Sequence, residues 1–150
     1  MIRYFMLFFI VIFAYSEDLK IMSKFFTYDP DKNITIFKKD VNITKKSDNI
    51  LSDNLVVFFN ANKKPYKFIA TNNVRFNIVM DKNTTYKGKC DKLIYFFKRG
   101  DIILIGNASI LKKETNESIK GDKIVINRIK KSAKVIGKNT PVEIILKVNE

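Results

Sequence analysis

Histidine and tryptophan are absent from this chain of 150 residues, and cysteine occurs once, at Cys90. Without an imidazole there is no histidine base, no Ser-His-Asp triad and no histidine-ligated metal site. A lone cysteine cannot form an internal disulfide, so we expect Cys90 to be a small residue within a strand. With 5 glycines and 3 prolines, the chain is also neither collagen-like nor of low complexity.

The composition that remains favours a packed β-rich domain with anionic partners. Hydrophobic residues make up 46% of the chain, which is too many for a disordered protein, and the 13 Phe and 6 Tyr favour strands. The formal net charge of +13 indicates nucleic acid, acidic lipid headgroups or a phosphorylated glycolipid as partner, or else a lysine-rich solvated surface. No block of five or six like charges occurs, which argues against a nucleic-acid-binding arm.

The first sixteen residues predict a secretory signal peptide. Arg3 precedes an almost wholly apolar run over residues 4–14, and Ala14 and Ser16 supply the small residues that a signal peptidase reads. The run is short for a membrane span, which needs about 20 apolar residues. We therefore expect cleavage after Ser16, export to the periplasm and one mature domain over residues 17–150. The alternative is an uncleaved N-terminal anchor.

The remainder reads as short strands separated by turns rich in Asn, Asp and Lys, with no sustained helical spacing. Strands are expected over residues 19–22, 34–43, 53–59, 66–80, 84–97, 102–111, 119–129, 133–136 and 142–148. The segment 66–80 is either one strand or two strands broken near Asn72 and Asn73. Polar turns are expected over residues 28–33 and 45–49. This pattern predicts an all-β sandwich, roll or barrel.

Two short patterns recur along the chain. An Asx residue followed by Val or Ala, any residue, and Ile or Phe occurs at residues 40–43, 73–76 and 107–110, at spacings of 33 and 34. An Asp followed by a strand-like segment occurs at residues 53–57, 91–95 and 122–126, at spacings of 38 and 31. Near-constant spacing is typical of stacked β units, each of which needs its neighbours to bury its apolar face.

Side chains at alternate positions of a strand share a face, and this rule collects the apolar residues on one side. The set indicates either an ordinary core or a groove between two sheets that holds an apolar ligand. The predicted lining is Phe37, Val41, Ile43, Leu55, Val57, Phe59, Val74, Phe76, Leu93, Tyr95, Phe97, Leu104, Ala108, Ile110, Ile124 and Ile126. The opposite face is mixed and combines Lys38, Asn42, Asn54, Arg75, Lys92, Ser109 and Lys123 with Val56, Phe58, Ile94, Phe96 and Ile103.

Three motifs carry a family resemblance. They read Cys90-Asp91-Lys92-Leu93-Ile94-Tyr95, then Leu104-Ile105-Gly106-Asn107-Ala108-Ser109-Ile110, then Ile119-Lys120-Gly121-Asp122-Lys123-Ile124. In this order, behind a signal peptide, they resemble the OstA-like (LptA) family of periplasmic lipopolysaccharide-transport bridge proteins. Cys90 stands in place of the family's alanine, and Lys39-Asp40 and Asn72-Asn73 stand in place of Gly-Asn.

The resemblance implies an open β-jelly roll that is V-shaped in section and has neither a catalytic site nor a cofactor. Its groove would carry the lipid A acyl chains of lipopolysaccharide between the inner and outer membranes of a Gram-negative cell, for outer-membrane assembly. Copies of the chain, or this chain and the transport components of the two membranes, would associate end to end by strand addition. Basic residues near the rim would meet headgroup phosphates.

Alternative functions remain at this point. The same fold would serve a membrane-anchored partner of the bridge (LptC-like), and the charge would suit a basic nucleic-acid-binding β-domain. An enzyme is not expected, because Asp53, Asp91 and Asp122 recur with the repeat and are interpreted as turn residues at strand starts. Asn-x-Ser/Thr sequons at Asn33, Asn83 and Asn116 predict glycosylation sites if the host modifies them.

Overall fold

The computed structural model describes residues 18–148, so the predicted signal peptide lies outside the described residues. The described chain is all-β, as predicted. Its ten strands are β1 (Leu19–Met22), β2 (Phe25–Asp29), β3 (Ile34–Lys45), β4 (Asp48–Phe59), β5 (Pro65–Asp81), β6 (Thr84–Phe96), β7 (Asp101–Lys112), β8 (Glu117–Asn127), β9 (Ser132–Ile136) and β10 (Glu143–Ile145).

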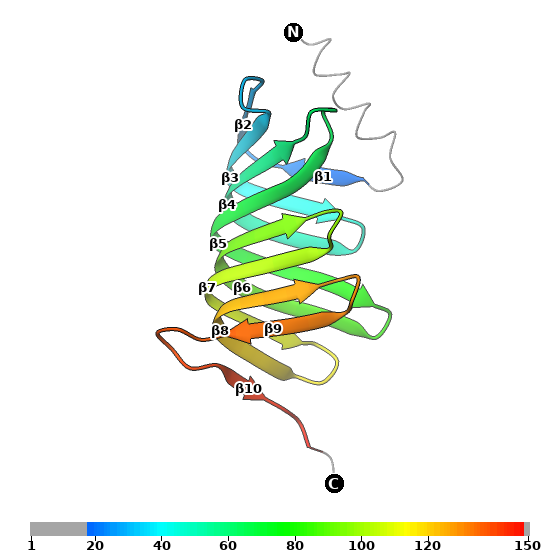
Figure 1. The fold of residues 1–150 in the computed structure, drawn as a ribbon, viewed down its shortest axis with the longest axis vertical. Coiled ribbons are helices and arrows are strands. Elements are labelled where there is room, and N and C mark those ends of the chain that lie inside the picture. The colour runs from blue at the N-terminus through cyan, green and yellow to red at the C-terminus, as the bar shows by residue number, and fades with distance from the viewer. Residues whose placement is uncertain (1–17, 149–150) are drawn as a thin grey trace.

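All ten strands belong to one antiparallel sheet (Figure 1). The long strands β3 to β8 form a meander in which each pairs with the strand before it and the strand after it. At one end both β1 and β2 pair with β3, and at the other both β9 and β10 pair with β8. Each end of the sheet is therefore split into two short strands.

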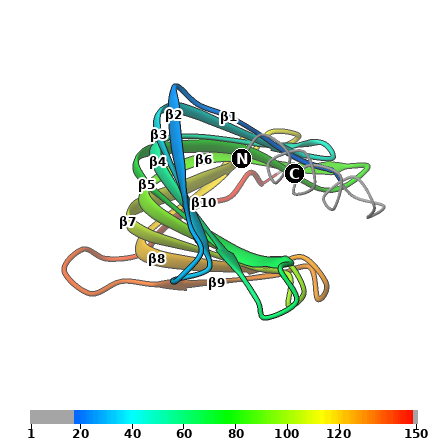
Figure 2. The same cartoon turned by 90° about the horizontal axis from the view of Figure 1, so that it is seen from above.

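The sheet folds along a line through the middle of its long strands, and Figure 2 shows the resulting V. Pairing skips a residue at this line in every long pair, which marks a row of β-bulges. The extra residue lies in β3, β5 and β7, where two successive residues have positive φ. These residues are Lys39 (70°) and Asp40 (52°), Asn72 (68°) and Asn73 (53°), and Gly106 (83°) and Asn107 (47°).

The bend divides the sheet into two walls. The first wall comprises β1, β10 and residues 41–45, 48–52, 74–81, 84–90, 108–112 and 117–121. The second wall comprises β2, β9 and residues 34–38, 54–59, 65–71, 92–96, 101–105 and 123–127. The hairpin turns of both walls lie on the side away from the bend, at the mouth of the V (Figure 2).

The bulges keep the apolar side chains of both walls inside the V. In β4 the buried positions change parity at the bend, from Ile50 and Ser52 to Leu55 and Val57. In β5, which carries an extra residue, the buried positions keep one parity, from Phe68 and Ala70 to Val74 and Phe76, so the bulge keeps paired residues of the two strands on the same face. The core that results includes Leu55, Phe68, Leu93, Leu104 and Ile124, all at 0% exposure.

The structure corrects several predicted boundaries. Residues 25–29 form β2, although residues 28–33 were expected to turn, and β4 begins at Asp48, although residues 45–49 were expected to turn. The segment around Asn72 and Asn73 is a bulge within one continuous strand. Asp53, Asp91 and Asp122 lie in the middle of strands and not at their starts, because the repeat marks the bend of the sheet.

Candidate functional site

The space between the two walls holds every residue of the predicted lining. Fourteen of the sixteen are buried, and Phe37 and Phe97 are partly buried and packed against them. Three aromatic rings stack in this interior: the Phe68 and Tyr95 centroids lie 5.0 Å apart, and Phe97 lies 5.7 Å from Phe68 and 5.4 Å from Tyr95. The predicted face is thus brought together as one apolar interior.

The predicted lining leaves out six further buried apolar residues, namely Ile50, Phe68, Ala70, Ile78, Cys90 and Ile102. Strand parity gave a signal for four of them, because Ile78 follows Phe76 and Ile102 precedes Leu104 at the same parity. Extending the parity of Val74 and Phe76 backwards gives Ala70 and Phe68, provided that the segment is one strand. Ile50 follows a polar cluster that was interpreted as a turn. Burial raises the pKa of the Cys90 thiol to about 12, so this cysteine is protonated and unreactive, as expected of a core residue.

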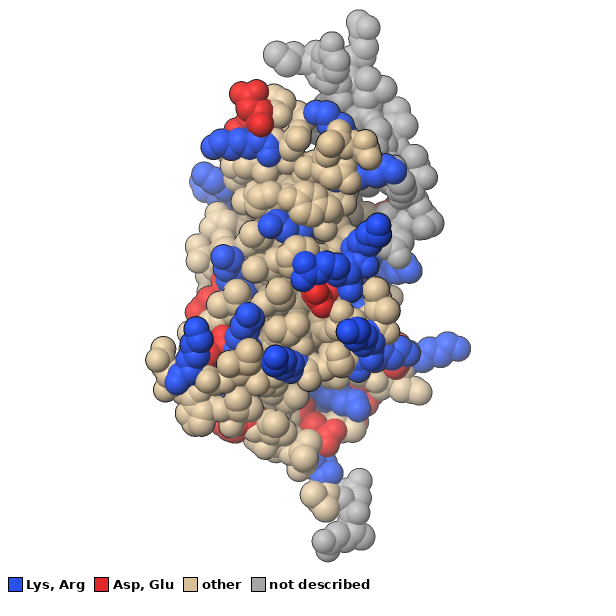
Figure 3. Space-filling view, in the orientation of Figure 1, with Lys and Arg blue, Asp and Glu red and all other residues tan. Residues whose placement is uncertain are grey.

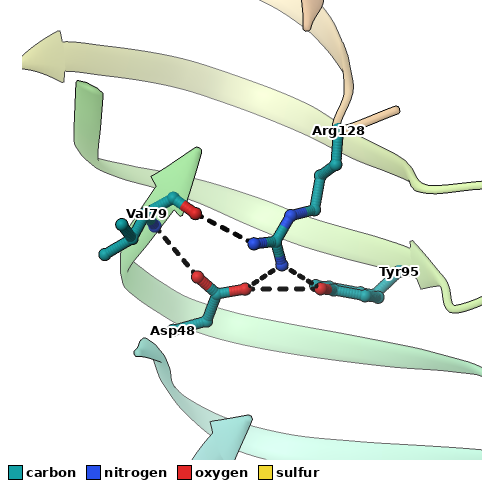
Figure 4. A network of polar contacts seen from close by, with 4 residues as sticks. All are labelled: Asp48, Val79, Tyr95 and Arg128. Atoms are coloured by element: carbon teal, nitrogen blue, oxygen red, sulfur yellow. Dashed lines mark hydrogen bonds and ion pairs between the residues drawn. The ribbon is translucent and has the colours of Figure 1, made fainter. Parts of the chain in front are cut away.

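At the mouth of the V, one arginine forms hydrogen bonds that link the second wall to the first (Figure 4). Arg128 lies in the turn between β8 and β9, and its Nη1 donates to the carboxylate of Asp48 and to the hydroxyl of Tyr95, the latter at 2.6 Å. Its Nη2 donates to the carbonyl of Val79 at 2.9 Å. Asp48 Oδ1 accepts from the backbone N–H of Val79 at 2.9 Å. We call these four residues the clasp.

The clasp joins elements of opposite walls. Asp48 and Val79 belong to the first wall, Tyr95 belongs to the second wall, and Arg128 lies in the second wall's β8–β9 turn. Two weaker contacts lie beside it: Lys131 Nζ is 3.7 Å from Asp81 Oδ2, and Lys45 Nζ is 5.9 Å from the Tyr95 ring centroid. The β8–β9 turn therefore closes the mouth of the V at this level.

The clasp is largely withdrawn from solvent, since the side chain of Asp48 is 2% exposed and that of Arg128 is 24% exposed. Burial is the main cause that raises the pKa of Tyr95 to about 12, so its hydroxyl keeps its proton and donates to Asp48 at 3.3 Å. Removing one partner of such a pair typically costs about 3–5 kcal/mol, because the other charge stays buried without compensation. Losing either Asp48 or Arg128 alone would therefore be costly while the mouth is closed.

The recurring aspartates cross-link the bend. Asp53 Oδ2 accepts from the Asn73 side chain at 2.9 Å, and Asp91 Oδ2 accepts from the Asn107 side chain at 3.1 Å. Asp122 instead accepts from the backbone N–H groups of residues 138–140 and from a hydroxyl, and these bonds lower its pKa to about 2. These carboxylates hold strands and a loop in place, and this structural role explains why they recur without a catalytic function.

Exposed apolar side chains gather at the two ends of the sheet. The β1–β2 end presents Met22, Phe25, Phe26 and Tyr28, which are 42–56% exposed. The β9–β10 end presents Val142, Ile144, Ile145, Leu146 and Val148, which are 38–77% exposed. In the described chain, each of β1, β2, β9 and β10 pairs with a single neighbour.

The described residues lack two other kinds of feature. Between residues 18 and 148, no three His, Cys, Asp or Glu side chains are placed to hold a metal ion. The same residues contain no helix with the length and apolarity that crossing a membrane requires. Asn33, Asn83 and Asn116 all lie in hairpin turns, and their glycosylation stays a prediction.

Comparison with known proteins bears on this arrangement. The sequence model of a family described as LptA/(LptD N-terminal domain) LPS transport protein matches residues 20–132, from β1 to the start of β9. The chain belongs to this family. Its members are transport proteins and not enzymes, in agreement with the sequence-based expectation.

A solved structure shares the fold. The crystal structure of LptH, the LptA-homologous periplasmic component of the lipopolysaccharide transport device of Pseudomonas aeruginosa, superimposes with a TM-score of 0.77. The match covers 87% of this chain and 95% of that chain, at 12% sequence identity. At that identity the likeness shows the fold, which is the predicted open β-jelly roll. A search of curated protein sequences finds no match.

Proposed function

We propose that this protein carries lipopolysaccharide through the periplasm, with the lipid A acyl chains held between its two walls. The observation that supports this most is the apolar interior, which extends from strand to strand along the whole V and includes all sixteen predicted residues. Each methylene group that leaves water for such an interior contributes about 0.8 kcal/mol, so a long apolar lining suits an acyl chain. Membership of a lipopolysaccharide transport family points to the same cargo.

Loading requires the walls to separate. The interior is filled by its own side chains, with most core residues at 0–3% exposure, so an acyl chain must replace contacts between the walls. The clasp closes the mouth, because Arg128 of the β8–β9 turn is bonded to Asp48 and Val79 of the first wall. Lipid entry from the side therefore includes opening of the clasp.

The bridge between the inner and outer membranes forms by strand addition at the two ends. The backbone of the end strands β1, β2, β9 and β10, each paired with a single described neighbour, offers a partner edge hydrogen bonds, and the exposed apolar side chains there offer apolar contacts. The partners are further copies of this chain and the transport components of the two membranes. N-terminal sequencing of the exported protein separates the soluble bridge from an anchored partner: the bridge starts at Glu17, and the anchored protein starts at Met1.

A photocrosslinking amino acid tests the groove directly. At Leu104, which is buried between the walls, it is expected to label added lipopolysaccharide. At Ser109, on the outer face of the first wall, it is expected to leave lipopolysaccharide unlabelled. Labelling from Ser109 but not from Leu104 would place the lipid outside the V and refute the proposal.

A further inference from the structure

The outer faces of the two walls differ in chemistry. An antiparallel sheet with one solvated face normally alternates apolar and polar residues, so its outer face is polar. The first wall follows this rule, and one cross-strand row of its outer face reads Asn42, Leu51, Arg75, Lys89, Ser109 and Lys120. The second wall breaks the rule, and its central outer row reads Ile36, Val56, Ile69, Ile94, Ile103 and Val125.

These six residues, which we call the outer row, are direct cross-strand partners from β3 to β8. Each is part-exposed and alternates with side chains that point into the V, such as Leu93 and Leu104. No other described element packs over them, since every described strand belongs to the one sheet. A continuous uncovered apolar band of this kind marks an interaction surface more often than a solvated one.

Cations flank the outer row. Lys38, Lys92 and Lys123 occupy the neighbouring row on the side of the bend, and Lys134 pairs with Val125 at the end of the outer row. Figure 3 looks onto this wall, and Lys and Arg are spread over it among uncharged residues, while Asp and Glu lie mainly toward the edges. The face is therefore both apolar and basic.

Aromatic and basic side chains meet on the mouth side of the outer row. Lys67 Nζ lies 4.6 Å from the Phe58 ring centroid, 5.7 Å from that of Phe96 and 5.9 Å from that of Tyr66. The Arg99 guanidinium carbon lies 4.0 Å above the Phe96 ring. Aromatic rings and long basic side chains in contact are suited to a boundary where one side is apolar and the other carries charge.

We propose that the outer face of the second wall docks on the surface of an anionic phospholipid bilayer. Lysine ammonium groups pair with lipid phosphates, while the outer row and the aromatic rings face the boundary between headgroups and acyl chains. Charge complementarity selects this occupant over a second copy of the chain, because two such faces would bring lysines against lysines. The surface lies on the opposite side of the sheet from the interior, so the inference does not rest on the proposed function.

Vesicle flotation of the mature protein, residues 17–150, tests the docking surface. The wild type is expected to float with vesicles that contain phosphatidylglycerol, to stay unbound with phosphatidylcholine alone, and to dissociate at high salt. The double substitution Ile94→Ser with Ile103→Ser, which leaves the charge unchanged, is expected to weaken binding about tenfold. The matched control, Leu51→Ser with Leu111→Ser on the outer face of the first wall, is expected to bind like the wild type.

A second pair of variants keeps the test valid if the first pair fails to fold. Lys92→Ser with Lys123→Ser removes two charges beside the outer row, and Lys87→Ser with Lys120→Ser removes two charges from the first wall. Weaker binding of the former alone supports the docking surface. Absence of wild-type binding to anionic vesicles, or equal weakening by both charge pairs, overturns it.

Discussion

At the bend of the sheet, each of β3, β5 and β7 has two successive residues with left-handed backbone conformation, and each strand uses a different pair of residue types there. Gly106-Asn107 and Asn72-Asn73 use the residue types that tolerate positive φ best. Gly106 is also confined by space, because a Cβ there would lie 2.5 Å from Asp91 Oδ2. Lys39, with φ of 70°, is the least suited of the six, since the left-handed region costs an ordinary residue about 1–2 kcal/mol.

Replacement of Lys39 by glycine is expected to raise the free energy of unfolding by up to about 1 kcal/mol. Glycine relieves the left-handed strain but loses about 0.5–1 kcal/mol through the entropy of the unfolded chain. Urea denaturation measures the change. Lys38→Gly, one residue earlier and without positive φ, is the control and is expected to destabilise. Equal destabilisation by both changes would contradict the strain argument.

A second residue-scale prediction concerns Asp122 and pH. Hydrogen bonds from residues 138–140 lower its folded-state pKa from 3.8 to about 2. A lowered pKa means that the carboxylate stabilises the fold above about pH 4 and that this contribution is lost as pH falls toward 2. Asp122→Asn is therefore expected to be less stable than the wild type at neutral pH, with the difference shrinking between pH 4 and 2. Thermal unfolding across that range measures it, and a pH-independent difference would argue against the assignment.

At the scale of elements, the β8–β9 turn matters most, because its Arg128 bonds to both Asp48 and Val79 of the first wall. Its Arg128 is bonded to a residue 80 positions earlier, to one 49 positions earlier and to one 33 positions earlier. Hairpin pairing in a meander is local, but this contact joins strands that are not neighbours in the sheet. The contacts of this turn therefore contribute to the stability of the fold only while the mouth of the V is closed.

Arg128→Gln is expected to destabilise the protein by about 3 kcal/mol, because Asp48 stays buried without its cation. The same change is expected to speed the uptake of lipopolysaccharide, because the mouth opens more easily. Denaturant unfolding and the rate of labelling from Leu104 measure the two effects. Lys131→Gln, which breaks the more exposed pair with Asp81, is the control and is expected to change stability by at most about 1 kcal/mol. Unchanged uptake by Arg128→Gln would show that lipid does not enter through the clasp.

Sequence patterns predicted the features of this fold that depend on neighbours along the chain. Alternation placed Leu93, Tyr95 and Leu104 inside, because each strand sets its own two faces. The clasp was not predicted, since Asp48 lies in the polar stretch 45–49 and acquires its role only when Arg128 is brought to it in space. In the sequence, the second wall's outer face was seen only as a mixture of apolar and polar residues. The continuous apolar row became evident only from the register that pairs its residues across six strands.

For the whole molecule, we expect the ends of the sheet to be the surfaces through which it assembles with partners. Ile144→Lys places a charge on the exposed apolar end at β10, and it is expected to reduce concentration-dependent association of the purified protein. Light scattering coupled to size-exclusion chromatography measures the mass. Leu111→Lys on the outer face of the first wall adds the same charge away from the ends and serves as the control. If both variants associate equally well, strand addition at this end is not the contact.

The bulge in every long hairpin has a consequence for how such molecules vary in length. Each hairpin brings its own bend and its own share of both walls, so a hairpin inserted or deleted whole leaves the fold line of its neighbours unbroken. Strands in a sheet are about 4.8 Å apart, so each such event lengthens or shortens the V by about 10 Å. The length of the V would therefore change in fixed steps, one hairpin at a time.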